Sequence, residues 1–309
     1  MTALANNPYQ SRIDAEETIA PRRDPVVYAA SSAKLPADEE RVRSYEHNGF
    51  VVLDDVFSER EVEYFQREAE RLRCDRMLAK REETIVEPES SEIRSIFNVP
   101  QFSPIFQRLV HDTRLVGWAR YLLNDDVYLH QSRLNFKPGF AGKEFYWHSD
   151  FETWHVEDGM PRMRAVSMSI ALTDNKPSNG SVMLIPGSHR HYVSCGGVTP
   201  ENHYRQSLRR QEYGVPSRAG LEQLAEGNEI AVVTGRAGSV LLFDCNTMHG
   251  SAGNITPYPR TNLFFVFNAM SNRLAAPASG QKPRPEFIAR RRNIQSIEPI
   301  GYQADDYRQ

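Results

Sequence analysis

The stretch 145–154, together with a histidine much further along the chain, contains the residue types of a metal site. His148 and Asp150 are two positions apart, and such residues on a β-strand point to the same face because strand side chains alternate with a period of two. His249 supplies a second imidazole. Two histidines and one carboxylate leave several metal positions open, which suits non-haem Fe(II) oxygen chemistry. We therefore predict that His148, Asp150 and His249 bind Fe(II) and form the catalytic centre.

The residues around this pair favour the metal interpretation over a simpler one. A bare His-x-Asp pair is a weak motif, and the alternative is a surface histidine beside an acid on a turn. Here aromatic residues flank the pair on both sides, as in a half-buried strand. Two buried polar ligands cost desolvation energy unless a partner compensates, and a metal ion would do so. Three other histidines are rival ligands: His155, His189 and His191.

Basic residues near these ligands predict a site for an acidic co-substrate. A 2-oxo acid such as 2-oxoglutarate would occupy two of the open metal positions and O₂ the third. The far carboxylate then needs a cation, and arginine is preferred because its planar fork makes two charge-assisted hydrogen bonds. Arg260 follows His249 closely enough to lie on the next strand, and Ser251 offers a hydroxyl to the same carboxylate. Lys137 is a second candidate cation, whereas the alternative for Arg260 is an exposed strand edge.

Composition excludes several other classes of function. The chain has 309 residues, 40% of them hydrophobic, and its net charge of −3 comes from 37 basic and 40 acidic residues. This balance gives no electrostatic case for a nucleic-acid partner or an anionic membrane. The three cysteines are far apart, which favours a reducing compartment over a disulfide framework. The first residues lack the apolar core of a signal peptide, and no window approaches a membrane span. We expect a cytoplasmic protein.

The order of predicted elements indicates one β-rich domain. Residues 1–40 lack periodicity and are predicted to form an extended or partly mobile arm, whereas 41–309 form a single domain. Ser58 and Glu61 make a capping box, which predicts an amphipathic helix over 59–73. Strands are predicted at 127–137, 143–150, 165–173, 181–185, 239–244 and 260–269. Short strands separated by Gly/Pro turns favour a sandwich or barrel. The polar insertion near 188–230, with one predicted helix at 219–226, is typical of a lid.

The chain resembles the phytanoyl-CoA dioxygenase family of Fe(II)/2-oxoglutarate oxygenases, and within it the ectoine hydroxylases. The resemblance runs from about residue 45 to residue 285. Its most specific part is Phe-Tyr-Trp-His-Ser-Asp-Phe-Glu-Thr-Trp at 145–154, which continues to residue 161. The other matching stretches are 45–50, 131–137, 185–189, 211–216 and 243–254.

The resemblance implies a mainly β fold with flanking helices around a double-stranded β-helix core, the jelly roll of cupin-like proteins. It places iron on the three predicted ligands and 2-oxoglutarate against Lys137, Ser251 and Arg260. It also implies that the substrate is ectoine, hydroxylated to 5-hydroxyectoine with release of succinate and CO₂, and that the protein is a homodimer. The residues it places around ectoine are Gln131, Trp154, Asn262, Phe264 and Arg284.

The chemistry of ectoine agrees with these residue types. Ectoine combines a delocalised amidinium cation with a carboxylate. An aromatic face such as Trp154 attracts the cation by about 0.5–2 kcal/mol, and an arginine would hold the carboxylate. If the strand that carries Asp150 continued, Trp154 would have the parity to face the same pocket.

Two alternatives remain open from the sequence. One is a 2-oxoglutarate-dependent hydroxylase of another small amino acid or of an acyl thioester, although no basic cluster suits the phosphates of coenzyme A. The other is a non-catalytic jelly roll that binds a metal or a solute.

Overall fold

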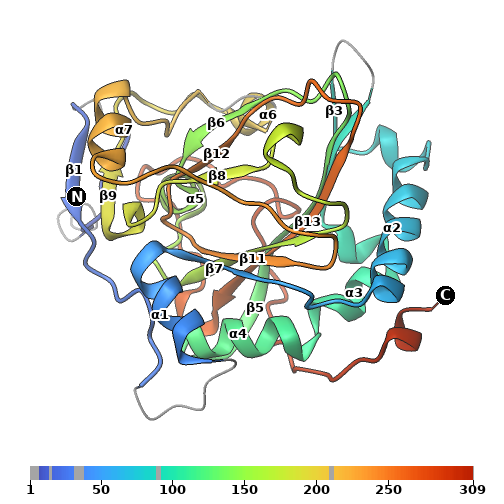
Figure 1. The fold of residues 1–309 in the computed structure, drawn as a ribbon. Helices are drawn as coiled ribbons and strands as arrows, with labels where there is room; N and C mark the ends of the chain where they lie inside the picture. The colour runs from blue at the N-terminus through green and yellow to red at the C-terminus, as the bar shows by residue number, and fades with distance from the viewer. Residues whose placement is uncertain (1–6, 14–15, 31–37, 88–91, 209–211, 309) are drawn as a thin grey trace.

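The computed structural model describes residues 7–13, 16–30, 38–87, 92–208 and 212–308 (Figure 1). A seven-stranded sheet has the order β2-β11-β7-β13-β5-β4-β3, and a four-stranded sheet has the order β10-β8-β12-β6. All strand pairs within them are antiparallel. The first sheet comprises β2 (Phe50–Leu53), β11 (Val240–Asp244), β7 (Ala165–Ala171), β13 (Arg260–Ala269), β5 (Val127–Lys137), β4 (Ile93–Phe97) and β3 (Thr84–Val86). The second comprises β10 (Ala231–Val232), β8 (Val182–Leu184), β12 (His249–Ser251) and β6 (Phe145–His148).

The helices lie outside these sheets. The α-helices are α1 (Glu39–Asn48), α2 (Glu59–Arg73), α3 (Pro104–Val110), α4 (Thr113–Leu123), α5 (Asp150–Asp158), α6 (Tyr204–Ser207) and α7 (Arg218–Ala225). The 3₁₀ turns are η1 (Leu78–Lys80), η2 (Val99–Gln101), η3 (Pro177–Asn179), η4 (Ser188–Arg190), η5 (Met270–Asn272) and η6 (Ala304–Tyr307). No helix in these described ranges is both long and apolar enough to cross a membrane.

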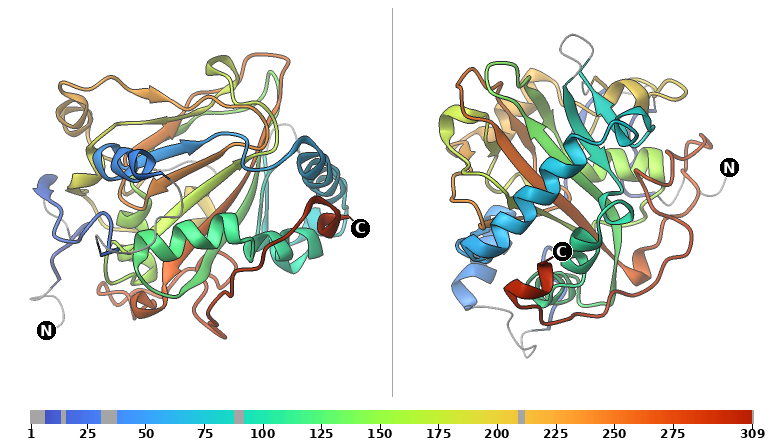
Figure 2. Two further views of the ribbon diagram at one scale, coloured as in Figure 1. Left: turned by 60° about the horizontal axis from the view of Figure 1, so that its bottom comes forward. Right: turned by 90° about the vertical axis from the view of Figure 1, so that its right-hand side faces the viewer.

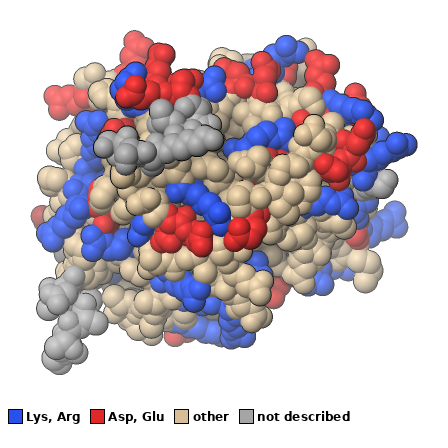
Figure 3. Space-filling model, turned by 90° about the horizontal axis from the view of Figure 1, so that it is seen from below, with Lys and Arg blue, Asp and Glu red and all other residues tan. Residues whose placement is uncertain are grey.

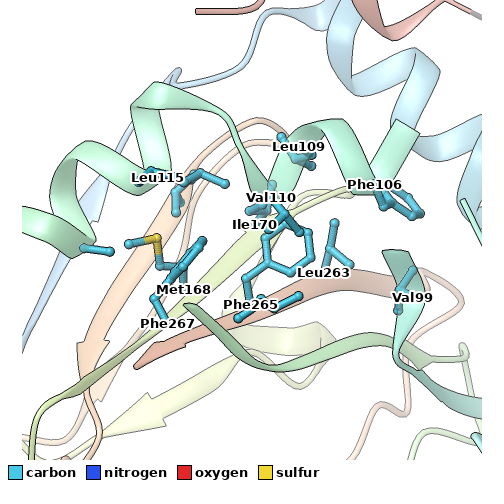
Figure 4. Close-up of a cluster of buried hydrophobic side chains, with 14 of the residues drawn as sticks. Val99, Phe106, Leu109, Val110, Leu115, Met168, Ile170, Leu263, Phe265 and Phe267 are labelled. Carbon is cyan, nitrogen blue, oxygen red and sulfur yellow. The ribbon is translucent and has the colours of Figure 1, made fainter. Parts of the chain in front are cut away.

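Alternation along the central strands separates the main core from the interior of the fold. Helices α3 and α4 lie along one face of the seven-stranded sheet (Figure 2). Leu263, Phe265 and Phe267 of β13 point toward these helices and are fully buried there (Figure 4). The residues between them on β13, such as Phe264, point the other way, toward the second sheet. This period of two is the property of a strand. Truncating Phe265 or Phe267 to alanine would cost about 3–5 kcal/mol, so this core contributes strongly to the stability of the domain.

The predicted fold class is confirmed, with differences at several element ends. The capping box at Ser58 and Glu61 is present, and α2 has the predicted bounds of 59–73. The strand predicted over 143–150 is wrong beyond His148, because β6 ends there and α5 begins at Asp150. The insertion contains the predicted helix as α7, but also β9 (His191–Ser194) and α6, which periodicity did not predict. Its role as a lid remains a prediction.

The described part of the N-terminal arm packs against the domain. The arm's β1 (Thr18–Pro21) pairs antiparallel with β9, and the side chains of Tyr9 and Arg12 are buried. Other parts of the predicted arm, at 1–6, 14–15 and 31–37, lie outside the described residues. On the face shown in Figure 3, basic and acidic side chains are interspersed, consistent with the net charge of −3.

Candidate active site

The structure brings the three predicted metal ligands together. His148 and His249 are direct partners across the β6–β12 pair, and their ring centroids are 4.2 Å apart. The Asp150 carboxylate lies 3.6 Å from His148 Nε2 and 3.9 Å from His249 Nε2. One ligand atom from each residue lies within 4.8 Å of the others. Among the described residues, no other group of three such side chains converges in this way.

Backbone contacts orient both imidazoles toward a common point. His148 Nδ1 lies 2.9 Å from the carbonyl oxygen of Tyr146, and His249 Nδ1 lies 2.9 Å from that of Thr247. In the tautomer that donates these hydrogen bonds, Nε2 carries the free lone pair that a metal requires. Burial and the neighbouring His148 lower the pKa of His249 to about 4, so that His249 is neutral near pH 7. The donor set therefore fits Fe(II).

Asp150 is held as a carboxylate by its surroundings. Burial alone would raise its pKa, but the neighbouring His249 and His148 outweigh burial and hold the pKa of Asp150 well below its usual range. Ser167 Oγ on β7 donates to Asp150 Oδ2 at 3.2 Å. A hydrogen bond to one carboxylate oxygen leaves the other free to bind a metal.

The rival histidines are engaged elsewhere. His155 contacts the backbone oxygen of Met160 and the side chain of Asn7. His189 Nε2 contacts the carbonyl oxygen of Glu46. His191 is exposed on β9. None of these three histidines is therefore part of the metal site.

Three basic side chains share a cavity with the metal ligands. Lys137, Arg260 and Arg133 all line it, and no Asp or Glu in the described ranges forms an ion pair with any of them. Lys137 and Arg260 are directly opposite each other across the β5–β13 pair and are 5% and 3% exposed. Lys137 Nζ donates to Ser251 Oγ at 2.8 Å and to the carbonyl oxygen of Ala252. The predicted co-substrate residues therefore converge.

The electrostatics of this cluster favour the binding of an anion. Burial, together with the charges of Arg260 and Arg94, lowers the pKa of Lys137 to about 6. Burial and the charge of Arg133 lower the pKa of Arg260 to about 10. Nε of Arg260 and of Arg133 are both buried without a hydrogen-bond partner. Buried like charges without counter-ions are costly, and a dicarboxylate would relieve that cost.

The residues predicted to hold the organic substrate are divided among four environments, the fourth being that of Trp154. Gln131 and Phe264 line the cavity of the metal ligands. The side-chain amide of Asn262 lies 3.0 Å from Ser169 Oγ. When the amide oxygen is oriented toward the neighbouring donors, it accepts a hydrogen bond from Arg260 Nη1 at 3.3 Å. Arg284 lines a separate cavity beside the 279–286 segment and makes a two-pronged ion pair with Asp158.

The strand argument for Trp154 is wrong, because this residue lies on helix α5. Its side chain is 3% exposed in a core cluster with Phe151 and Met160, and its ring makes an edge contact with His130, with centroids 5.1 Å apart. A helical signal was present in the sequence. Acidic residues in the first turn and Gly159 at the end, with φ of 71°, are features of helix termini.

Sequence reasoning missed several residues of the cavity. Arg94 of β4 and Val266 of β13 line it, and Ser167 supports Asp150 as described above. The signal for Ser167 was available, since Ser167 and Ser169 alternate with apolar residues on β7 and must share its inner face. Leu208, beyond α6, also lines the cavity, and no local pattern predicted that contact.

A jelly roll in which two paired strands present the two histidines, and the start of the following helix presents the aspartate, defines the class of non-haem iron oxygenases. Residues 45–262 match the phytanoyl-CoA dioxygenase family, and the chain belongs to this family. It is 53% identical over 300 residues to the ectoine dioxygenase of Bordetella bronchiseptica, covering 97% of each chain. The ectoine dioxygenase of Sphingopyxis alaskensis is 53% identical over 92% of each chain.

Two solved structures show the same fold with ligands. EctD from S. alaskensis with 2-oxoglutarate and 5-hydroxyectoine superposes with a TM-score of 0.87 at 47% identity, over 96% of this chain and 99% of that one. The same protein with bound Fe gives a TM-score of 0.86 at 46% identity over the same shares. Iron therefore binds within this fold in a close relative.

Proposed function

We infer that the protein catalyses the Fe(II)- and 2-oxoglutarate-dependent hydroxylation of ectoine to 5-hydroxyectoine, with release of succinate and CO₂. The observation that carries the reaction class is the single cavity in which the His-Asp-His ligands meet Lys137, Arg133 and Arg260, none of which forms an ion pair with an Asp or Glu among the described residues. The substrate rests on the near full-length identity to ectoine dioxygenases. The cavity geometry and the sequence identity are independent lines of support.

Different residues of the cavity bind the iron and the co-substrate. When bound at His148, Asp150 and His249, iron supplies the activation of O₂ that is coupled to oxidative decarboxylation of the 2-oxo acid. Arg260, Lys137 and Ser251 hold the far carboxylate, and Ser251 Oγ also accepts a hydrogen bond from Lys137 Nζ. Because these groups lie on paired strands of a rigid sheet, the co-substrate is fixed relative to the metal ligands. Such positioning supplies much of the rate of a reaction between bound partners.

For the organic substrate we propose contacts at the far end of the same cavity. Gln131 can donate and accept at the edge of the ectoine ring, and its Nε2 already donates to the carbonyl oxygen of Ile288 at 2.9 Å. Phe264 offers a ring that is only 9% exposed. Trp154 would support this wall from α5, and Asn262 would act by orienting Arg260. Arg284 lies in the separate cavity, so it would reach the ectoine carboxylate only after leaving Asp158 and turning toward the metal site.

The deciding experiment measures succinate and hydroxyectoine together after adding Fe(II), 2-oxoglutarate and ectoine. Equal yields are expected, and parallel incubations with another small amino acid and an acyl-CoA should give little product. Succinate without hydroxyectoine would support a different substrate, and neither product would support a non-catalytic binding protein. Gln131→Ala should weaken ectoine binding while decarboxylation of 2-oxoglutarate persists. Replacing Gln107, an exposed residue of α3, by alanine is the matched control.

We also propose that the protein acts as a homodimer in the cytoplasm. The three cysteines are free thiols, two of them buried, which suits a reducing compartment. The dimer rests on the family resemblance, and light scattering coupled to size-exclusion chromatography tests it. A monomer mass at working concentrations would exclude it.

A further inference from the structure

The N-terminal arm carries two arginines whose surroundings are unusual for a chain terminus. The arm precedes the family match, which begins at residue 45. The side chains of Arg12 and Arg22 are nevertheless 0% and 3% exposed, and each forms a buried ion pair. Buried arginines require partners, and breaking such pairs is costly. Those partners lie in the segments that carry the metal ligands.

Arg12 binds the helix that begins with Asp150. Its guanidinium makes two parallel bonds to Glu152, from Nε at 2.9 Å and from Nη2 at 2.5 Å. Nη1 adds bonds to Glu157 at 2.5 Å and to Thr199 Oγ1 at 2.9 Å. Arg12 also has a φ of 54°, a backbone conformation that persists in a non-glycine residue only where surrounding contacts hold it. Arg12 therefore joins α5 to the insertion.

Arg22 binds the turn that leads to His249. Nη1 donates to Asp244 Oδ1 at 2.7 Å, and Nη2 donates to the carbonyl oxygens of Pro25 and Met163. The same Asp244 oxygen accepts from the backbone N–H of Asn246 at 2.8 Å. Asp244 is 2% exposed, so Arg22 is its charge partner and the turn depends on this pair.

The 244–247 turn also contacts the junction of β6 with α5, which carries His148 and Asp150. Ser149, which lies between His148 and Asp150, donates to Asn246 Oδ1 at 3.0 Å. The backbone N–H of Phe151 donates to the carbonyl oxygen of Cys245 at 2.8 Å. The junction of β6 with α5 is thus bonded to the turn that Arg22 supports. A continuous set of contacts runs from the arm to all three ligand-bearing segments.

We propose that Arg12 and Arg22 are positioning residues through which the N-terminal arm fixes the geometry of the metal ligands. Arg12 acts on α5 and hence on Asp150. Arg22 acts on the 244–247 turn and hence on His249 and the β6–α5 junction. Changes to groups that orient metal ligands typically cost about 10- to 100-fold in metal affinity. The inference rests on the proposed metal site but not on the identity of the organic substrate.

The test is Co(II) binding to the metal-free protein, followed by the visible absorption of Co(II), which reports the number and arrangement of its ligands. Arg12→Gln and Arg22→Gln are compared with Arg23→Gln, the exposed neighbour in the same arm. Leu109→Ala serves as a stability control, because Leu109 is fully buried on α3 in the separate main core. Circular dichroism confirms that each variant is folded at the temperature of the titration.

We expect Arg12→Gln and Arg22→Gln each to weaken Co(II) binding by about tenfold or more and to alter the visible spectrum. Arg23→Gln should match the wild type, and Leu109→Ala should lower the Tm without weakening Co(II). If Arg12→Gln does not fold, Arg12→Lys keeps the charge but loses the two-pronged bond to Glu152, and it should shift affinity in the same direction. Wild-type affinity in the folded arginine variants, or equal weakening in Leu109→Ala, would overturn the inference. Failure of the wild type to bind Co(II) would instead refute the metal site.

Discussion

Replacing Arg260 by alanine is the sharpest test of the co-substrate site. Arg260 is 3% exposed and lies opposite Lys137, and no acidic side chain in the described ranges pairs with it. Removing one partner of a desolvated charge pair costs about 2–5 kcal/mol. Since Lys137 and Ser251 would still contact the carboxylate, we expect the lower part of this range, about 2–3.5 kcal/mol. At 1.4 kcal/mol per tenfold, that is about 30- to 300-fold in affinity for 2-oxoglutarate.

The assay is the dependence of succinate formation on 2-oxoglutarate and, separately, on ectoine. The apparent affinity for 2-oxoglutarate should fall much more than that for ectoine. Arg236→Ala is the control, because Arg236 is exposed, lies outside the cavity and pairs with Glu59 at 3.5 Å. Without ligands, Arg260→Ala should not lower the Tm, since it removes a buried charge beside Lys137 and Arg133. Equal losses for both substrates, together with a lower Tm, would show that Arg260 has a structural role.

Three further perturbations address the rest of the site. Because the pKa of Lys137 is lowered to about 6, carboxylate binding requires proton uptake, so affinity for 2-oxoglutarate should fall by up to about tenfold per pH unit above 6. Lys137→Met should remove this dependence, and a slope that survives in Lys137→Met would contradict it. His249→Ala should abolish turnover and Co(II) binding with little change in circular dichroism, and retained activity would mean that another ligand replaces it. Trp154→Ala should lower the stability by about 3–5 kcal/mol and the hydroxyectoine yield, whereas Trp154→Phe should retain part of both; near wild-type hydroxylation in Trp154→Ala would place the ectoine site elsewhere.

The sequence by itself determined the elements whose signals are local. The capping box at Ser58 set the start of α2, because both partners of that motif lie within one helical turn. Alternation of apolar residues located β7 and β13 and showed which residues share a face. The residue types at positions 148, 150 and 249 indicated the metal, since ligand chemistry depends on side chains that the sequence states directly.

The local signals at helix α5 conflict, and only the tertiary structure decided where this helix begins and what surrounds it. The aromatic residues after His148 favour a strand locally, but Phe151 bonds to Cys245 and Glu152 to Arg12, partners that lie far away in the chain. These contacts, together with Gly159 at the C-terminus of the helix, outweigh the local preference for a strand. As a result, the Trp154 side chain points into the core. The convergence of Lys137, Arg133 and Arg260 on one cavity likewise depends on strand register across the sheet. Periodicity records which side of an element is buried, but not which distant residue buries it.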